Sequence, residues 1–349
     1  MKTILFGIVG WNIAETTRMI EVAKAFRHAY DCQFLSYGGQ FESLVADNGF
    51  KLHHLEPAET PEKIDLLWKI DRGEAFQQPW STEELNQRVR SELDLIESLQ
   101  PAVVFLGSVL TLPLSCRIAK VPLVSVIPLA LSRPYIQARL PLSPFLPPIL
   151  NRLACFLVER LPFLVGNVRK VTREYGLPAP RSLLDLWEGD LNFVTEAPAF
   201  SLLKTLPQHW YFCGPIFAHL DTPVPEQVQA LLQQQRQPLV YFAMGSSANH
   251  NVLQKTLSAF EGLPVQVIAP IAAHLQDGDP VPDNVLVTDW LPALTVTEQV
   301  DIAVTHGGQG TVQTTVTAGV PFVGIGMQPE QALNIFVFAQ YGSAVLLNR

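Results

Sequence analysis

The stretch of this sequence best suited to bind an anion is a histidine followed closely by three glycines. It comes after the apolar run 302–305 and reads His306, Gly307, Gly308, Gln309, Gly310, Thr311. A buried strand, a glycine-rich turn, a connector and a second apolar run, here 322–327, make a βαβ unit. The turn of such a unit lies outside the carboxyl end of the sheet, where ligands bind. Glycines let the backbone approach a ligand, and N–H groups at a helix start attract phosphate. The turn therefore predicts a phosphate-binding site.

The connector, residues 311–319, could form either a helix or a strand by its local composition. It is rich in β-branched threonine and valine, which are poor helix formers. The alternation of Val312, Thr314 and Val316 also fits a strand. Two parallel strands, however, need a crossover of about a dozen residues, usually helical, and Gly319 followed by Pro321 is a good helix stop. We predict a helix.

A turn with two glycines is by itself a common loop, so its surroundings decide its meaning. Asp289-Trp290-Leu291-Pro292 stands upstream and Pro329-Glu330-Gln331 downstream. The block from Trp290 to Gln331 resembles the nucleotide-sugar donor signature of the UDP-glycosyltransferase-like family. That family includes plant secondary-product, animal glucuronosyl and bacterial antibiotic (macrolide-type) glycosyltransferases. The resemblance is specific in this block and weaker, but continuous, over the rest of the chain.

The resemblance implies an α/β protein with the GT-B fold, in which two Rossmann-like doubly wound domains face each other across a cleft. We expect an acceptor-binding domain at 1–220, an interdomain linker at 221–237 and a donor-binding domain at 238–349. The linker prediction rests on the proline-rich run 221–225 and the glutamine-rich run 233–237. Family members usually continue for a few more helices, so the carboxyl-terminal part is expected to be short here.

The resemblance also implies a role for each position of the donor motif. Trp290 would stack on the nucleotide base beside Leu291, His306 would donate to the diphosphate, and Glu330 and Gln331 would hold the sugar hydroxyls. The phosphate cradle would be completed by Gly307, Gly308, Gly310 and Thr311, together with Gly245 and Ser246 at the end of the first strand of the second domain. Such donors would also stabilise the charge that accumulates on the leaving diphosphate. The family typically uses no metal, so we expect no metal and no cofactor besides the nucleotide-sugar co-substrate.

Two positions depart from the family pattern. Where members usually carry a Glu that takes the ribose hydroxyls, this chain has Thr314, a neutral and shorter hydrogen-bonding group. Where many members have the Gly-His pair that supplies the catalytic base, this chain has Ala14-Glu15. Glu15 is therefore a candidate base, and it is equally a first-turn acid favoured by the helix dipole. Asp94, on a polar helix, is a weaker second candidate.

The whole chain is consistent with two globular domains. It has 349 residues, of which 48% are hydrophobic and 16% charged, enough for two cores. Its net charge of −8 argues against generic nucleic-acid binding. The four cysteines, Cys32, Cys116, Cys155 and Cys213, form no Cys-x-x-Cys pair, which favours reduced thiols and a cytoplasmic protein. No run of 18 apolar residues predicts a membrane-spanning helix.

Strands and helices are expected to alternate along both domains. Strands are predicted at 3–9, 33–37, 51–55, 102–106, 123–128, 191–195 and 210–213, and then at 239–244, 265–269, 285–287, 302–305, 322–325 and 344–347. Helices are predicted at 16–29, 41–47 and 81–99. This alternation predicts parallel doubly wound sheets.

Residues 131–166 break the alternation. The segment is rich in proline, leucine and phenylalanine, and residues 150–164 fit a helix that carries Arg152 and Arg160. It lies within a region, 117–181, with ten Lys and Arg and only two acids, Glu159 and Glu174. Three interpretations stay open: the wall of a lipophilic acceptor pocket, a patch that rests peripherally on a membrane surface, or a helix packed on the sheet.

The function predicted from these residues is that of an inverting, metal-independent hexosyltransferase. It would move a hexose from a UDP- or dTDP-linked sugar to a hydroxyl of a hydrophobic small molecule or lipid. The first alternative is a non-catalytic GT-B-like binding or partner protein, which Thr314 and Glu15 would favour. A nucleotide-sugar 2-epimerase is a further alternative, although it would need acids around the sugar beyond Glu330. The acceptor, the sugar and the oligomeric state are not specified by the sequence.

Overall fold

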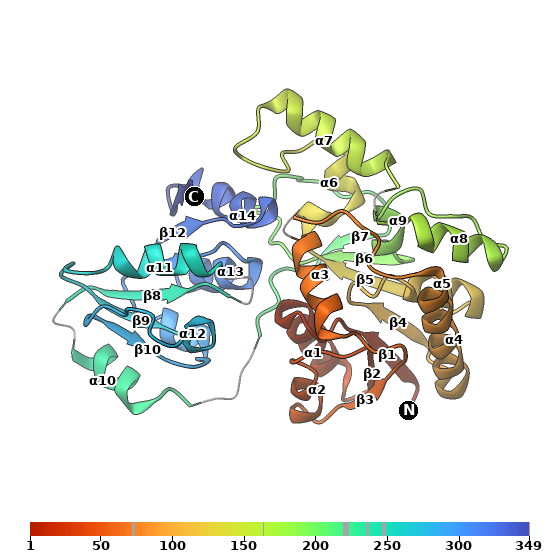
Figure 1. Ribbon diagram of the computed structural model, residues 1–349, viewed down its shortest axis with the longest axis horizontal. Helices are drawn as coiled ribbons and strands as arrows, with labels where there is room; N and C mark the ends of the chain where they lie inside the picture. The colour runs from red at the N-terminus through yellow and green to blue at the C-terminus, as the bar shows by residue number, and fades with distance from the viewer. Residues whose placement is uncertain (72–73, 163, 219–222, 235–236, 246–248, 349) are drawn as a thin grey trace. The chain divides into compact units, whose positions relative to one another are not determined.

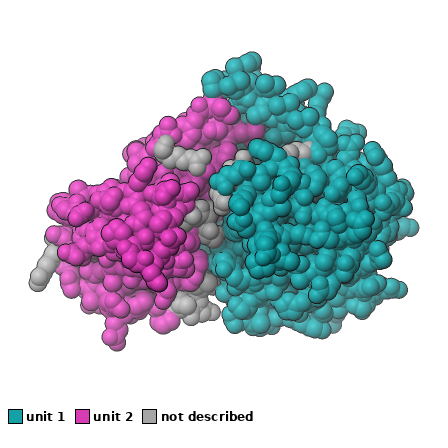
Figure 2. Space-filling view, in the orientation of Figure 1, with its two compact units in different colours: residues 1–140, 147–218 teal, residues 141–146, 219–349 magenta. Residues whose placement is uncertain are grey.

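The computed structural model of the chain describes residues 1–71, 74–162, 164–218, 223–234, 237–245 and 249–348. The chain divides into two compact units (Figure 2). The first unit holds residues 1–140 and 147–218, and the second holds 141–146 and 219–349. No helix in the described ranges is long and apolar enough to cross a membrane.

The first unit is built on a parallel sheet of seven strands in the order β3-β2-β1-β4-β5-β6-β7 (Figure 1). In a fully parallel sheet both faces are covered, so its central strands are mostly apolar and buried. Phe6 stacks with Phe34 and with Phe105, which lie on the two strands that flank its own. The strands are β1 (Thr3–Gly7), β2 (Asp31–Ser36), β3 (Lys51–His54), β4 (Val103–Leu106), β5 (Leu123–Ile127), β6 (Leu191–Val194) and β7 (Trp210–Phe212).

The helices of this unit follow their strands. They are α1 (Ile13–Phe26), α2 (Ser43–Asp47), α3 (Pro61–Asp71), α4 (Thr82–Leu99), α5 (Leu112–Ala119), the 3₁₀ turn η1 (Leu129–Leu131), α6 (Arg133–Gln137), α7 (Pro148–Arg160), α8 (Gly166–Glu174) and α9 (Leu184–Trp187). Helix α4 begins where Ser81 and Glu84 form a reciprocal capping box. Helix α1 begins three residues earlier than expected, because the Asn12 side chain accepts hydrogen bonds from the N–H groups of Ala14 and Glu15.

The second unit is built on a parallel sheet of six strands in the order β10-β9-β8-β11-β12-β13 (Figure 1). Its strands are β8 (Leu239–Ala243), β9 (Gln266–Ala269), β10 (Val285–Val287), β11 (Ile302–Thr305), β12 (Phe322–Ile325) and β13 (Ala344–Leu347). Its helices are α10 (Glu226–Gln234), α11 (His250–Ser258), the 3₁₀ turn η2 (Ala272–His274), α12 (Ala293–Thr297), α13 (Gln309–Thr317) and α14 (Pro329–Ala339).

The core of the second unit lies on both faces of its sheet. Alternate residues of a strand point to opposite faces, so Tyr241 packs in one cluster with Ala303 and Phe322. Val240 and Phe242, its neighbours on β8, pack in the other cluster. The predicted doubly wound α/β fold is confirmed in both units, and the ambiguous connector 311–319 is helical, as α13.

The structure adds elements that the sequence analysis did not predict. Helices α3 and α5 lie in stretches left unassigned. The range 221–237, predicted as a linker, contains α10, whose Val228 and Leu232 pack into the core of the second unit. Four residues separate these two apolar positions, which is the spacing of one helix face, but the surrounding glutamines obscured that pattern.

Candidate functional site

The predicted phosphate site lies at the point where the strand order of the second sheet reverses. Strands β8 and β11 are neighbours in the middle of the sheet, and their last residues, Ala243 and Thr305, are in register. Each is followed by a loop that leaves the carboxyl end of the sheet. Ligands of doubly wound sheets bind in the crevice at this topological switch point. Gly245 and His306 therefore come to the same place from two loops far apart in the sequence.

Two glycines enclose the imidazole of His306. A Cβ atom on Gly245 would lie 2.4 Å from Cε1 of His306, and one on Gly308 would lie 2.4 Å from its Nε2. Gly245 also has a φ of +58°, in the left-handed region that favours glycine. His306 is 6% exposed. Glycine is thus required at both positions by the close approach of the ring, which a larger residue would displace.

The environment of His306 keeps its imidazole neutral. Burial lowers the pKa of His306 to about 4. Its Nδ1 lies 3.4 Å from the carbonyl oxygen of Ala243, which can only accept a hydrogen bond. The neutral ring therefore carries its proton on Nδ1, and Nε2 holds a lone pair. His306 donates from Nε2 only after it takes up a second proton or shifts its tautomer.

A second histidine, which the sequence analysis did not identify, stands at the same edge. His274 closes η2, the turn that follows β9, and burial lowers its pKa while a hydrogen bond with the Gly245 backbone opposes that shift. His274 also contributes electrostatically to the lowered pKa of His306. Because β9 neighbours β8, the position of His274 after a predicted strand was a usable signal.

Helix α13 begins at the glycine turn. Gly308 is its N-cap residue and offers no side chain to the first N–H groups, which have no partner within a helix. A Cβ on Gly310 would meet nothing within 4 Å, so this turn is open. Thr311 follows, and Thr314 is 8% exposed one turn further along. The predicted phosphate cradle is therefore a helix start with open space beside it.

Helix α14 carries the residues predicted to hold the sugar. The Glu330 carboxylate accepts a 2.8 Å hydrogen bond from Nδ2 of Asn334, which also donates to the carbonyl oxygen of Gly307 at 3.1 Å. Asn334, absent from the sequence prediction, thus ties Glu330 to the glycine turn. Its spacing of four residues from Glu330 was the available signal.

Gln331 is used inside the protein. It is 3% exposed. Its Oε1 accepts hydrogen bonds from the backbone N–H groups of Met327, at 3.0 Å, and Gln328, at 3.2 Å. Its Nε2 donates to the side chain of Gln328 at 2.8 Å. These bonds form the cap of α14, so the contact of Gln331 with a sugar hydroxyl stays a prediction.

The predicted base-binding pair follows β10. Trp290 is 45% exposed, whereas Leu291 is 3% exposed and packs in the core. An exposed aromatic face at the carboxyl edge of the sheet suits stacking. Ser246 lies outside the described residues.

The candidate catalytic base belongs to the first unit. Glu15 lies in the first turn of α1 and is 8% exposed. One carboxylate oxygen pairs with Arg18 at 2.7 Å, and the other is buried without a hydrogen-bond partner. A buried, unsatisfied carboxylate oxygen calls for an explanation. The second candidate, Asp94, is exposed on α4.

The second unit offers almost no positive charge to a diphosphate. Lys255 and Arg349 are the only basic residues from 238 to 349, against eight Asp and Glu. No group of three or more His, Cys, Asp or Glu side chains that could hold a metal ion is found in the described part of the chain. What the described site presents to an anion is the helix start, the backbone of the glycine turns and two imidazoles.

The sequence resembles that of known glycosyltransferases along its length. Residues 254–349 match the family model of the erythromycin biosynthesis protein CIII-like C-terminal domain. A PGL/p-HBAD biosynthesis glycosyltransferase of Mycobacterium tuberculosis is 29% identical over 99% of this chain and 81% of its own length. A PGL/p-HBAD biosynthesis rhamnosyltransferase of Mycobacterium bovis is also 29% identical, over 99% of this chain and 77% of its own.

Solved glycosyltransferase structures share the fold. The spinosyn forosaminyltransferase superposes with a TM-score of 0.69 at 15% identity, and the glycosyltransferase VinC, in complex with dTDP, with 0.67 at 16%. Each match covers 99% of this chain and 86% of the other. The donor motif, the sequence relatives and the shared architecture agree. This chain is therefore a glycosyltransferase with the GT-B fold, and its sequence is similar to that of the UDP-glycosyltransferase-like family.

Proposed function

We propose that this protein transfers a hexose from a UDP- or dTDP-linked donor to a hydroxyl of a hydrophobic small molecule or lipid, with inversion and without a metal. The observation that carries the proposal is the glycine-enclosed His306 at the switch point, beside the uncapped start of α13. One relative is named a rhamnosyltransferase, and one structural neighbour was solved with dTDP. Both support a nucleotide diphosphate sugar as the donor.

In the proposed reaction, the acceptor oxygen forms a new bond to the anomeric carbon as the bond from that carbon to the diphosphate oxygen breaks. The bonding electrons leave with the diphosphate, and the acceptor proton passes to a base. Negative charge thus grows on the leaving group, where donors that are already oriented lower the barrier most. In this proposal the α13 N–H groups and His306 are those donors.

The remaining groups would position the donor. Trp290 would stack on the base, and Glu330, oriented by Asn334, would accept from sugar hydroxyls. Thr314 would make a neutral contact at the position where the family usually has a Glu. For the base we propose Glu15, whose unpartnered carboxylate oxygen is the group that would accept the proton.

Calorimetric titration with UDP, dTDP and GDP tests the donor site. We expect one nucleotide to bind in the micromolar range and His306→Ala to weaken that binding by about 10- to 100-fold, the worth of one hydrogen bond to a charged group. His250→Ala is the matched control, because His250 is a surface histidine of the same unit paired with Asp279. Equal affinity in His306→Ala and the parent would remove His306 from the site.

A transfer assay with the nucleotide sugar tests the base. Glu15→Gln should leave donor binding intact and lower the transfer rate by about 100-fold or more. Arg18→Gln, which removes the ion-pair partner of Glu15 and keeps its carboxylate, is the comparison variant. Transfer at the parental rate by Glu15→Gln would eliminate Glu15 as the base. Donor binding without transfer to any hydroxyl acceptor would instead favour a binding protein.

A further inference from the structure

Helix α7 presents its apolar side to solvent. Its buried residues are Asn151 and Cys155, which lie four positions apart and so on one face. The Cys155 thiol anchors that face by donating to the carbonyl oxygen of Leu140. The opposite face carries large apolar side chains that are each 39% to 71% exposed. These residues, the α7 stripe, are Ile149, Leu150, Leu153, Phe156, Leu157 and Leu161.

This arrangement is inverted relative to an ordinary surface helix, which turns its apolar stripe to the core. The stripe runs along the whole of α7, a length of about 20 Å at 1.5 Å per residue. Contiguous apolar surface of this kind marks a site of interaction rather than a scattered exposed residue. It lies within residues 147–218 and so belongs to the first unit alone.

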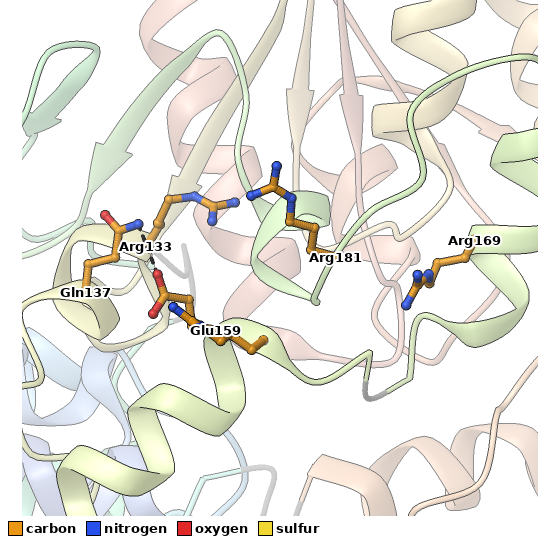
Figure 3. Close-up of a pocket in the computed structure, with 6 residues that line it drawn as sticks. Arg133, Gln137, Glu159, Arg169 and Arg181 are labelled. Atoms are coloured by element: carbon orange, nitrogen blue, oxygen red, sulfur yellow. Dashed lines mark hydrogen bonds between the residues drawn. The ribbon is translucent and has the colours of Figure 1, made fainter.

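A pocket rich in arginine adjoins the carboxyl end of this helix. It has a volume of about 490 Å³ and is lined by residues of α6, α7, α8 and the loop before α9, namely Arg133, Gln137, Glu159, Arg160, Arg169 and Arg181 (Figure 3). The side chains of Arg133 and Arg181 point toward one another in this view. Glu159 and Arg160 belong to α7 itself, so the pocket is continuous with the stripe.

Three of the four arginines that line the pocket form no ion pair among the described residues. Arg133 pairs with Asp185 and Glu188, and Glu159 is held by Arg139 from outside the pocket. Within the described residues, the guanidinium groups of Arg160, Arg169 and Arg181 have no carboxylate within 4.0 Å. Arg160 lies instead over the ring of Phe156 in the α7 stripe, at 4.5 Å. Guanidinium groups that line one pocket without carboxylate partners can bind phosphate, whose oxygens match the bidentate geometry of arginine.

We propose that the α7 stripe and the arginine pocket together attach the protein to an anionic membrane surface. Lipid phosphate groups occupy the pocket while the stripe enters the boundary between headgroups and acyl chains. An amphipathic helix with leucine and phenylalanine on one side binds membranes in this way, and basic residues strengthen its attraction to anionic lipids. Arg152, also exposed on α7, reaches headgroups from the edge of the helix. This inference does not depend on the identity of the sugar donor.

Charge complementarity favours a membrane over a second copy of the chain. Residues 117–181 carry a charge of +8, from ten Lys and Arg and two acids, in a chain whose total is −8. In a symmetric dimer formed through this surface, the unpaired arginines of one copy would face those of the other. An anionic lipid surface supplies the opposite charge over the whole patch.

Vesicle flotation with the full chain tests the proposal. We expect the protein to float with vesicles of phosphatidylcholine and phosphatidylglycerol and to stay behind with phosphatidylcholine alone. Two double variants separate the contributions: Leu153→Asn with Leu157→Asn in the stripe, and Arg169→Gln with Arg181→Gln in the pocket. Each should weaken partitioning by about ten-fold or more. Because all four residues lie at the surface or line an open pocket, the variants keep the fold, which circular dichroism verifies.

Matched controls lie away from this surface. Leu263→Asn changes a leucine that is 49% exposed in the second unit. Arg90→Gln with Lys51→Gln removes two exposed charges of the first unit that lie outside the pocket. Both controls should partition like the parent.

Three results would overturn the proposal. The first is no partitioning onto anionic vesicles. The second is binding of inorganic phosphate by calorimetry without any partitioning, which would make the pocket a site for a soluble phosphate. The third is a dimer, seen by sedimentation velocity, that the stripe variant dissociates, because the stripe would then be a contact between copies. Donor titration of the same variants should be unchanged, which keeps this test separate from that of the glycosyl-transfer proposal.

Discussion

The two regions of this molecule proposed to meet phosphate are built on opposite principles. In the second unit, the glycine turn presents backbone N–H groups and a buried neutral histidine, and residues 238–349 around it include only two Lys or Arg. In the first unit, the arginine pocket presents formal positive charge at the surface. Fixed dipoles in a sheltered site are already oriented to stabilise the charge that develops during a reaction. Exposed guanidinium groups attract any anion and are screened by salt.

The two regions also differ in how the chain builds them. The glycine turn depends on residues brought to one sheet edge from three loops, at 245, 274 and 306, and a Cβ atom on Gly245 or Gly308 would displace the His306 ring. The arginine pocket depends on long flexible side chains from four neighbouring segments. We therefore expect phosphate binding at the glycine turn to be sensitive to the addition of single atoms. We expect phosphate binding at the arginine pocket to be sensitive to its total charge.

The largest expected effect concerns the buried neutral histidine. Its folded-state pKa of about 4 lies below the value of about 6.5 for an unfolded chain, so the unfolded state binds more protons between these values. The free energy of unfolding should therefore fall as the pH drops from about 6.5 to about 4, by about 3 kcal/mol from this group, and level off below.

Urea titrations at a series of pH values would measure this effect in the parent and in His306→Gln. The glutamine cannot titrate, so its stability curve should be flatter across the same range. The pKa of His274 is also lowered, so His274 also makes the free energy of unfolding fall as the pH drops. This contribution is present in both proteins and cancels in the comparison. Parallel curves would show that His306 is not buried as a neutral ring.

The next effect separates two glycines of one turn. Gly308→Val would place a Cβ 2.4 Å from His306 Nε2, so the ring must move, with an expected loss of about 1–3 kcal/mol of stability and of nucleotide binding by about 100-fold. Gly310→Ala, two residues later, meets open space and should stabilise α13 by up to about 1 kcal/mol.

Thermal unfolding and nucleotide titration of both variants check this contrast. If Gly310→Ala also weakens binding, the backbone at 310 approaches the ligand as closely as the proposed cradle requires. If Gly308→Val binds nucleotide as the parent does, the enclosure of His306 by glycine has no part in binding.

A third prediction concerns the proton that diphosphate binding requires. Because Nδ1 faces the Ala243 carbonyl oxygen, His306 can donate to a diphosphate from Nε2 as an imidazolium, with a proton taken up on binding. Affinity for a nucleotide sugar, whose diphosphate does not itself titrate here, should then rise about ten-fold per pH unit as the pH falls from 7 toward 5. Calorimetry in buffers of different ionisation enthalpy counts the protons. Binding without proton uptake would mean that the neutral ring leaves Ala243 and donates as the other tautomer.

Much of the fold could be predicted from the sequence, because apolar runs such as 302–305 and 322–325 have the length and composition of buried parallel strands. The helices that escaped prediction, such as α10, bury only a narrow apolar face. The glycine turn was identifiable by its composition. The enclosure of His306 by Gly245 was not, because 61 positions separate the two residues and only the β8–β11 pairing joins them.

The role of Gln331 illustrates a different limit. Its place after Pro329-Glu330 matched a sugar-binding motif, yet its amide caps α14. A glutamine at the third position of a helix is also the ordinary partner in a capping box, and composition alone does not distinguish the two uses. Similarly, the apolar character of 131–166 was evident, but the solvent-facing orientation of the α7 stripe needed the positions of Asn151 and Cys155.

The smallest expected effect is the response of nucleotide binding to salt. Its contrast with the response of membrane partitioning separates the glycine turn from the arginine pocket most sharply. Nucleotide affinity at the glycine turn should change by less than about three-fold between about 0.05 and 0.5 M NaCl, because buried dipoles are screened little. Partitioning onto anionic vesicles should fall by about ten-fold or more over the same range, since each exposed arginine acts through a screened potential. Both are measured on the same protein, so general unfolding by salt would lower both together. A steep salt dependence of nucleotide binding would show that exposed cations supply the diphosphate contacts. The second unit, with Lys255 as its one described Lys or Arg, would then not hold the diphosphate alone.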